Sequence, residues 1–221
     1  LITNQTTTLS DLFSSILPQT KDICFLIGYF YFSGFPEFYK NIKDKKMRIL
    51  VGLDIDIDLM NKVKEYEQFD QKRISKSRDQ QQYYEKLVKL FNNTNFFDSA
   101  EQQEAFKVFY EKIKEGSLEL RKTAEPNHAK MYLFEDNGND PTLPGHMIVG
   151  SSNLSLQGLK KRNELNVVFH DVDYNEGKDL FEKLWATATP IADTNTINLF
   201  EKHVIENIWY EKLPSPYAIY L

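Results

Sequence analysis

Hydrophobic residues recur with two different spacings along the first fifty residues, and each spacing predicts one kind of element. Apolar residues three or four positions apart predict a helix over residues 9–16, which Pro18 ends. Continuous apolar runs predict buried strands over residues 23–32 and 47–53, with a second amphipathic helix over residues 35–42 between them. A strand, a helix and a strand in this order are what a parallel βαβ unit requires.

A polar segment over about residues 58–116, rich in Gln, Lys and Glu, interrupts this pattern. Apolar residues at helical spacing over residues 87–91 and 106–113 predict two helices within it. Because their apolar stripes are narrow, we interpret the segment as a helical insertion in one core domain. Four of its basic residues lie within seven positions, at Lys72, Arg73, Lys76 and Arg78. Such a run is typical of a solvated helix face, and it also suits contact with a nucleic-acid backbone.

The second half of the chain returns to strands and adds two helices. Short apolar runs predict strands over residues 118–122, 129–134, 147–150 and 163–169. Helical spacing then predicts helices over residues 180–185 and 197–208. Together these patterns predict an α/β fold, with a mixed central sheet flanked by helices, as a single domain over residues 1–221.

Composition limits the classes of protein to which the chain can belong. Of its 221 residues 41% are hydrophobic, which suits one large core, and the net charge is −5. A general nucleic-acid coat protein is normally basic, so this charge argues against that class but allows a local basic groove. Cys24 is the only cysteine, which excludes an internal disulfide framework and suits a reducing compartment. With no targeting segment and no apolar run near the roughly 20 residues of a membrane span, we expect a cytoplasmic protein.

Polar residues of three short sequences combine the groups that phosphate chemistry uses. The sequences are Asn127-His128-Ala129-Lys130, Gly150-Ser151-Ser152-Asn153 and Asn163-Glu164-Leu165-Asn166. Alternate side chains of a strand share one face, so His128 and Lys130 point into the same site. Ser151 and Asn153 repeat that spacing of two residues. The candidate site residues are therefore His128, Lys130, Ser151, Asn153 and Glu164.

Each of these side chains has a physical role at a phosphate. The neutral imidazole of His128 is a competent nucleophile near pH 7. The ammonium group of Lys130 stabilises negative charge that grows on phosphate oxygens, and Ser151 and Asn153 donate hydrogen bonds to the same oxygens or hold the ring. Glu164 is suited to accept the second ring N–H and to stabilise the imidazolium form. We expect no metal, since no cluster of His, Cys and Asp has ligand spacing.

Taken separately, each of the three sequences has an ordinary structural explanation. A lone His-x-Lys pair arises often by chance, Gly-Ser-Ser-Asn is a common turn, and Asn163-Glu164 suits the start of a strand. Their joint occurrence in this order, on strands separated by a hairpin, favours the phosphate site.

The three sequences together resemble the HKD motif of the phospholipase D superfamily. Single-motif nucleases of that superfamily carry a glutamate eleven residues after the motif asparagine, and eleven residues after Asn153 stands Glu164. The segments Ile27-Gly-Tyr-Phe30 and Arg48-Ile-Leu-Val-Gly52 resemble the opening strands of such domains. The chain departs from the motif five residues after the lysine, where Glu135 stands in place of an aspartate.

The resemblance implies a mechanism without metal or cofactor. His128 attacks phosphorus to give a phosphohistidine, and a second histidine protonates the leaving oxygen. Only His128 has a lysine two residues on. A single motif resembles the nuclease branch, in which a homodimer brings two motifs together, whereas members that act on lipids usually carry both motifs in one chain. Residues 213–221 resemble the start of the linker to a helicase motor in bacterial proteins, and they equally suit a simple C-terminal cap.

The sequence therefore supports two hypotheses of different classes. The first is a metal-independent DNA nuclease domain of a larger helicase-type protein, which works as a homodimer on nucleic acid. The second is a catalytically idle nucleic-acid-binding or docking module of that helicase. Retention of all five site residues favours the enzyme, and the acidic charge favours the docking role. A lipid phosphodiesterase is disfavoured by the single motif and by the lack of an amphipathic membrane face.

Overall fold

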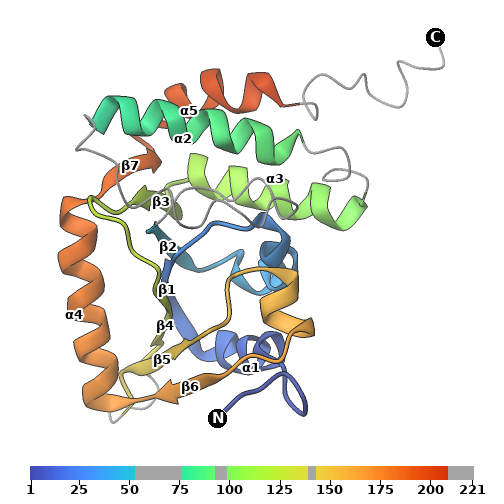
Figure 1. The fold of residues 1–221 in the computed structure, drawn as a ribbon, viewed down its shortest axis with the longest axis vertical. Coiled ribbons are helices and arrows are strands. Elements are labelled where there is room, and N and C mark those ends of the chain that lie inside the picture. The colour runs from blue at the N-terminus through green and yellow to red at the C-terminus, as the bar shows by residue number, and fades with distance from the viewer. Residues whose placement is uncertain (53–75, 93–98, 139–142, 209–221) are drawn as a thin grey trace.

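A computed structural model describes residues 1–52, 76–92, 99–138 and 143–208. Seven strands of these residues form one mixed sheet, in the order β6-β5-β4-β1-β2-β3-β7. The strands are β1 (Thr20–Ile27), β2 (Lys46–Val51), β3 (Leu118–Lys122), β4 (Lys130–Asp136), β5 (Gly145–Gly150), β6 (Asn166–Phe169) and β7 (Thr189–Ala192). The helices are α1 (Leu9–Ile16), α2 (Lys76–Phe91), α3 (Ala100–Lys114), α4 (Asp171–Thr187) and α5 (Ile197–His203). Helices flank the sheet on both sides, which confirms the predicted α/β fold (Figure 1).

The pairing of the strands divides the sheet into a parallel and an antiparallel part. β1, β2 and β3 run parallel to one another, as the predicted βαβ unit requires. β4 pairs antiparallel with the other edge of β1, and β5 and β6 follow it as antiparallel neighbours. Ile27, at the end of β1, therefore pairs with Lys130, 103 positions further along the chain.

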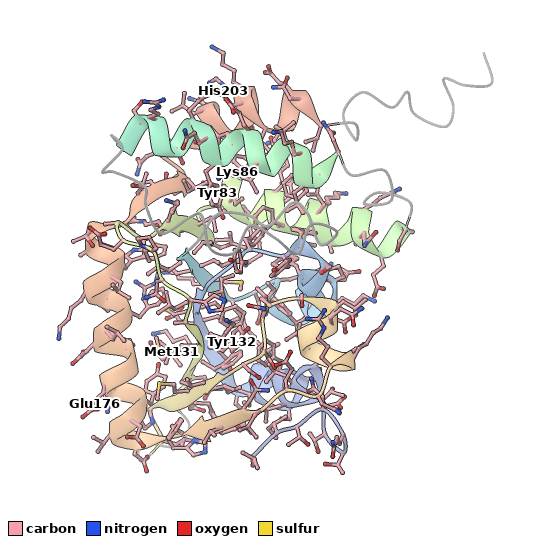
Figure 2. All side chains as sticks on the ribbon, in the orientation of Figure 1. Tyr83, Lys86, Met131, Tyr132, Glu176 and His203 are labelled. Atoms are coloured by element: carbon pink, nitrogen blue, oxygen red, sulfur yellow. The ribbon has the colours of Figure 1, made fainter. Side chains whose placement is uncertain are left out.

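Alternate residues of the central strands face two separate hydrophobic cores. In β1, Phe25 belongs to the core that α1, α2, α3 and α5 complete, whereas Leu26 belongs to the smaller core beneath α4. The same period of two places Tyr132 of β4 in the first core and Met131 in the second. Figure 2 shows Met131 on the side of α4 and Tyr132 on the side away from it. Side chains of β4 that share the parity of Tyr132, including Lys130, consequently face away from α4.

Two elements predicted near the N-terminus are wrong. The strand expected over residues 23–32 ends at Ile27. The helix expected over residues 35–42 is replaced by two 3₁₀ turns, at Phe32–Glu37 and Tyr39–Ile42. Pro36 explains the second difference, because proline has no N–H to donate and disfavours the α-conformation at the residue before it. The spacing of the apolar residues nevertheless predicted their burial correctly, since the aromatic side chains of this segment pack in the core.

Later elements differ from the prediction mainly at their ends. The strand predicted over residues 163–169 begins only at Asn166, and the helix predicted over residues 197–208 ends at His203. β7 was not predicted, because four residues that include Pro190 carry little strand signal. The stripes of α2 and α3 are wider than expected: both helices bury aromatic residues in the main core, at Tyr83, Tyr84, Phe91, Phe106 and Phe109. None of the described helices combines the length and the hydrophobicity that a membrane crossing demands.

Candidate active site

Four strands bring the predicted site residues to one end of the sheet. Ile27, the last residue of β1, pairs with Lys130, the first residue of β4. On the next pair, Met131 of β4 lies opposite Val149, so the start of β4 adjoins the end of β5. Gly150 in turn pairs with Asn166, the first residue of β6. Residues just before β4, just after β5 and just before β6 therefore gather at this end, and those residues are the three predicted sequences.

His128 and Lys130 are in direct contact. The Nζ atom of Lys130 lies 2.9 Å from Nε2 and 3.2 Å from Nδ1 of the imidazole, and it donates to the carbonyl oxygen of His128 at 3.2 Å. The lysine is buried and the histidine is exposed. The structure thus confines a positive charge to the side of the imidazole, where it is available to a phosphate that meets the ring.

The bend that follows β1 contacts the imidazole of His128. Tyr29 meets the ring of His128 edge to face, with centroids 5.7 Å apart and planes at 78°. Gly28 provides the space beside it, because a Cβ atom there would lie 2.8 Å from Cδ2 of His128. The bend after β1, which the sequence prediction treated as strand, is therefore part of the site.

Gly52 supports the residue that precedes the histidine. Asn127 donates its backbone N–H to the carbonyl oxygen of Gly52 at 2.9 Å. A Cβ atom on Gly52 would lie 1.9 Å from the carbonyl oxygen of Asn127, so only glycine permits this approach. The side chain of Asn127 accepts a hydrogen bond from the N–H of Ala129 at 2.7 Å, which holds the backbone around His128.

Ser151 and Glu164 form a second pair at the same end of the sheet. The hydroxyl of Ser151 donates to the carboxylate of Glu164 and accepts the backbone N–H of Leu165, the latter at 3.0 Å. Burial, and after it the negative charge of Glu164, raises the pKa of Tyr132 far above its ordinary value. Because the hydroxyl of Tyr132 donates to the carbonyl oxygen of Ser152, the neighbour of Ser151, at 2.7 Å, this pair lies beside the strand that carries the lysine.

Two buried residues that the sequence analysis did not single out hold these segments together. Ser152 is fully buried; its hydroxyl accepts from Nδ2 of Asn166 at 2.8 Å, and its carbonyl oxygen accepts from the hydroxyl of Tyr132 at 2.7 Å. The signal was present in the sequence, since both residues belong to the quoted motifs. Their inward position became visible only once the sheet register was known. Asn153 lies beside Ser152, with its Oδ1 atom buried and accepting no hydrogen bond from a described residue.

The remaining predicted residues lie at the opposite edge of the sheet, at the far end of β4 or outside the described ranges. Lys72 and Arg73 lie outside the described residues, as does the side chain of Lys76. Arg78 is exposed on α2, a helix that packs against β7 at the sheet edge opposite to β6. Glu135, the substitute for the motif aspartate, lies near the far end of β4 and accepts a hydrogen bond from Lys178 of α4.

The described residues contain no group of three or more His, Cys, Asp or Glu side chains arranged to hold a metal ion. The groups that could act on a phosphate at this end of the sheet are an imidazole, an ammonium group, a hydroxyl, an amide and a carboxylate. They supply a nucleophile, a fixed positive charge, hydrogen-bond donors and a proton acceptor.

A comparison with protein-family models adds independent evidence. Residues 17–185, most of the chain, match the family described as cardiolipin synthase, phospholipase D-like domain. The chain belongs to the phospholipase D-like family. The matched range contains every strand of the site and all five predicted site residues, so the family assignment and the geometry concern the same part of the molecule.

Solved structures to which the chain is similar include the proteins named NucT and Nuc. NucT from Helicobacter pylori is 12% identical, with a TM-score of 0.43, over 82% of this chain and 89% of its own. Nuc from Salmonella typhimurium, a phospholipase D family member, is 11% identical, with a TM-score of 0.40, over 81% of this chain and 88% of its own. Polyphosphate kinase from Porphyromonas gingivalis is 8% identical, with a TM-score of 0.38, and this chain spans only 19% of its length. No curated protein matched the sequence.

Proposed function

We propose that this phospholipase D-like chain is a metal-independent phosphodiesterase that cleaves DNA through a phosphohistidine on His128. The supporting observation is the contact between the exposed imidazole and the buried Lys130 ammonium group. In the first step a ring nitrogen forms a bond to phosphorus, and the bond from phosphorus to the leaving oxygen breaks. A second, protonated imidazole gives that oxygen its proton. The second imidazole, now neutral, takes a proton from water as that water attacks phosphorus; the P–N bond breaks, and both histidines return to their starting states.

The other site residues have distinct roles in this proposal. Lys130 supplies positive charge to the phosphate oxygens, and Asn153 offers a neutral donor to them. Glu164 remains the predicted acceptor for the second ring N–H of His128. Its contact with Ser151 fixes the carboxylate at the start of β6, which supports an orienting role.

The decisive experiment is cleavage of single- and double-stranded DNA in EDTA, with His128→Ala as the inactive control. We expect the parent to cleave in EDTA and, when the reaction is quenched early, to carry one DNA fragment bound through its terminal phosphate to histidine, in an acid-labile, base-stable P–N linkage. Activity that disappears in EDTA and returns with magnesium refutes the mechanism. DNA binding without cleavage under any condition identifies the idle binding or docking module instead, which the net charge of −5 favours.

The second imidazole is proposed to come from a second copy of the chain. The mechanism needs two imidazoles, and His128 is the only histidine of the sequence with a lysine two residues on. A two-fold axis that passes between two copies of His128 would place the two imidazoles opposite each other. If parent and His128→Ala subunits are mixed, a shared site makes the heterodimer nearly inactive, whereas independent sites leave about half of the activity. A stable monomer with full activity excludes the shared site.

The wider context of the domain is also a proposal. The resemblance of residues 213–221 to the start of a linker supports attachment to a helicase motor and hence work on nucleic acid in the cytoplasm. These residues lie outside the described ranges. Mass determination of the native protein from its source cells tests the attachment, because a helicase-type protein is far larger than 221 residues.

A further inference from the structure

Buried and partly exposed aromatic residues alternate in the bend after β1. Phe30 and Phe32 are fully buried, whereas Tyr29 and Tyr31, which alternate with them, are only half-buried. The two tyrosine rings lie 6.0 Å apart, with planes at 52°, and Tyr29 is the ring that meets His128. Two partly exposed tyrosine rings therefore lie in sequence next to the nucleophile, Tyr29 in contact with His128 and Tyr31 in contact with Tyr29. The two phenylalanines pack in the core.

A basic turn lies next to this segment. Gly34 approaches the carbonyl group of Leu154 so closely that a Cβ atom there would lie 2.7 Å from it. The hydroxyl of Ser33 accepts the backbone N–H of Leu156 at 3.4 Å, at the start of a turn that runs over Gln157–Lys161. The turn and its end carry three consecutive basic residues: Lys160, Lys161 and Arg162. Lys160 forms an ion pair with Glu37, and Lys161 and Arg162 are exposed.

We propose that Tyr29 and Tyr31 stack unpaired nucleobases beside the scissile phosphate, while Lys161 and Arg162 contact the backbone, which makes single-stranded DNA the preferred substrate. This inference rests on the proposed function and names its substrate class. Aromatic rings bind bases of any sequence through their faces, and basic side chains follow the phosphates. Inside a duplex both faces of each base are covered by its neighbours, so a base must be flipped out before the tyrosines can reach it.

The test measures binding in His128→Ala protein, so that no turnover is needed. The probes are a fluorescent single-stranded DNA oligonucleotide and an oligomer of the same length in which every residue is abasic. We expect His128→Ala protein to bind the oligonucleotide about tenfold or more tightly than the abasic oligomer, because only the former has bases to stack. Adding Tyr31→Ala is expected to remove most of that preference. Tyr31 is chosen because Tyr29 touches the nucleophile itself.

Matched variants separate stacking from a change of fold. Tyr31→Phe keeps the ring and is expected to keep the preference, whereas Tyr31→Leu keeps an apolar side chain without a ring and is expected to lose it. Replacing Lys161 and Arg162 with Gln is expected to weaken binding of both probes by a similar factor and to flatten its dependence on salt. The proposal is overturned if the preference for bases is absent, or if it survives in both Tyr31→Ala and Tyr31→Leu.

Hydrolysis of bis(4-nitrophenyl) phosphate by the parent distinguishes this inference from the proposed function. That small diester has no nucleobases and reports phosphodiester chemistry alone. Turnover of the diester without a preference for bases overturns the stacking inference and leaves the proposed function in place. A clear preference that Tyr31→Ala abolishes, in a protein that turns over neither the diester nor DNA, supports the stacking surface and refutes the phosphodiesterase.

Discussion

Gly52→Ala is expected to displace His128 and so lower activity, because Gly52 packs against Asn127, the residue that precedes His128. The added Cβ atom would lie 1.9 Å from the carbonyl oxygen of Asn127, whereas an ordinary contact between these atoms is about 3.3 Å. The peptide that leads into His128 must therefore move by about 1.4 Å. A misplacement of about 1 Å can cost about 100-fold in rate, and overpacking typically costs about 1–3 kcal/mol of stability. We expect kcat for DNA cleavage to fall about 100-fold, with a lower midpoint of thermal unfolding.

The matched control adds the same methyl group away from the site. At Gly177 of α4 a Cβ atom would meet the sulfur atom of Met147, the flexible end of a side chain, and alanine favours the helix by up to about 1 kcal/mol. We therefore expect Gly177→Ala to stay close to the parent in kcat. The experiment is a comparison of single-turnover rates and melting curves for the two variants. A Gly52→Ala protein with the parent rate and the parent melting point would refute the reasoning.

Three further predictions concern charges. Glu164→Gln is expected to keep the fold and lower kcat by two or more decades, since glutamine brings no charge to stabilise an imidazolium. A parent rate in single-turnover assays would show that Glu164 has no role in catalysis. The predicted basic cluster consists of Lys72, Arg73, Lys76 and Arg78. Replacing all four with Gln is expected to weaken DNA binding and flatten its salt dependence in fluorescence titrations. An unchanged slope would show that these residues do not contact the DNA backbone. The hydrogen bond from Arg48 lowers the pKa of Glu182. This ion pair therefore stabilises the fold fully above the ordinary carboxyl pKa of 4.5, and the stabilisation is lost as the pH falls through the lowered pKa. Glu182→Gln should therefore be less stable at pH 7, by about 1 kcal/mol or less, and the gap should close in denaturant titrations toward pH 3; a gap that does not depend on pH would contradict this.

The sequence was most informative where short motifs fall on regular strands. His128 and Lys130 were expected on one face because of their spacing, and the contact between them agrees with that expectation. The pairing of Ser151 with Glu164 could not be derived, because it depends on how β5 and β6 meet. Spacing also failed where proline limits the backbone: the apolar residues around Pro36 have helical periodicity and are buried, yet they form 3₁₀ turns.

Side chains that support the site without reacting were the hardest to predict. Gly28 and Gly52 matter because of what would collide with a Cβ atom, and that requires knowledge of which loop lies opposite. The inward position of Ser152 follows from its hydrogen bond with Asn166, fourteen residues away. A local sequence pattern contains information about the face of a strand on which a residue lies, but not about the partner that a distant segment presents.

The position of β4 in the sheet has a consequence for synthesis on the ribosome. β4 covers the free edge of β1, but Lys130 follows its partner Ile27 by 103 residues. At bacterial and eukaryotic rates of about 5–20 residues per second, that edge waits roughly 5–20 s for its partner. During this interval the nascent chain exposes the backbone of an apolar strand, a template for wrong pairing. Because Glu164 and β6 are made later still, the candidate site is complete only after the antiparallel half of the sheet has been added.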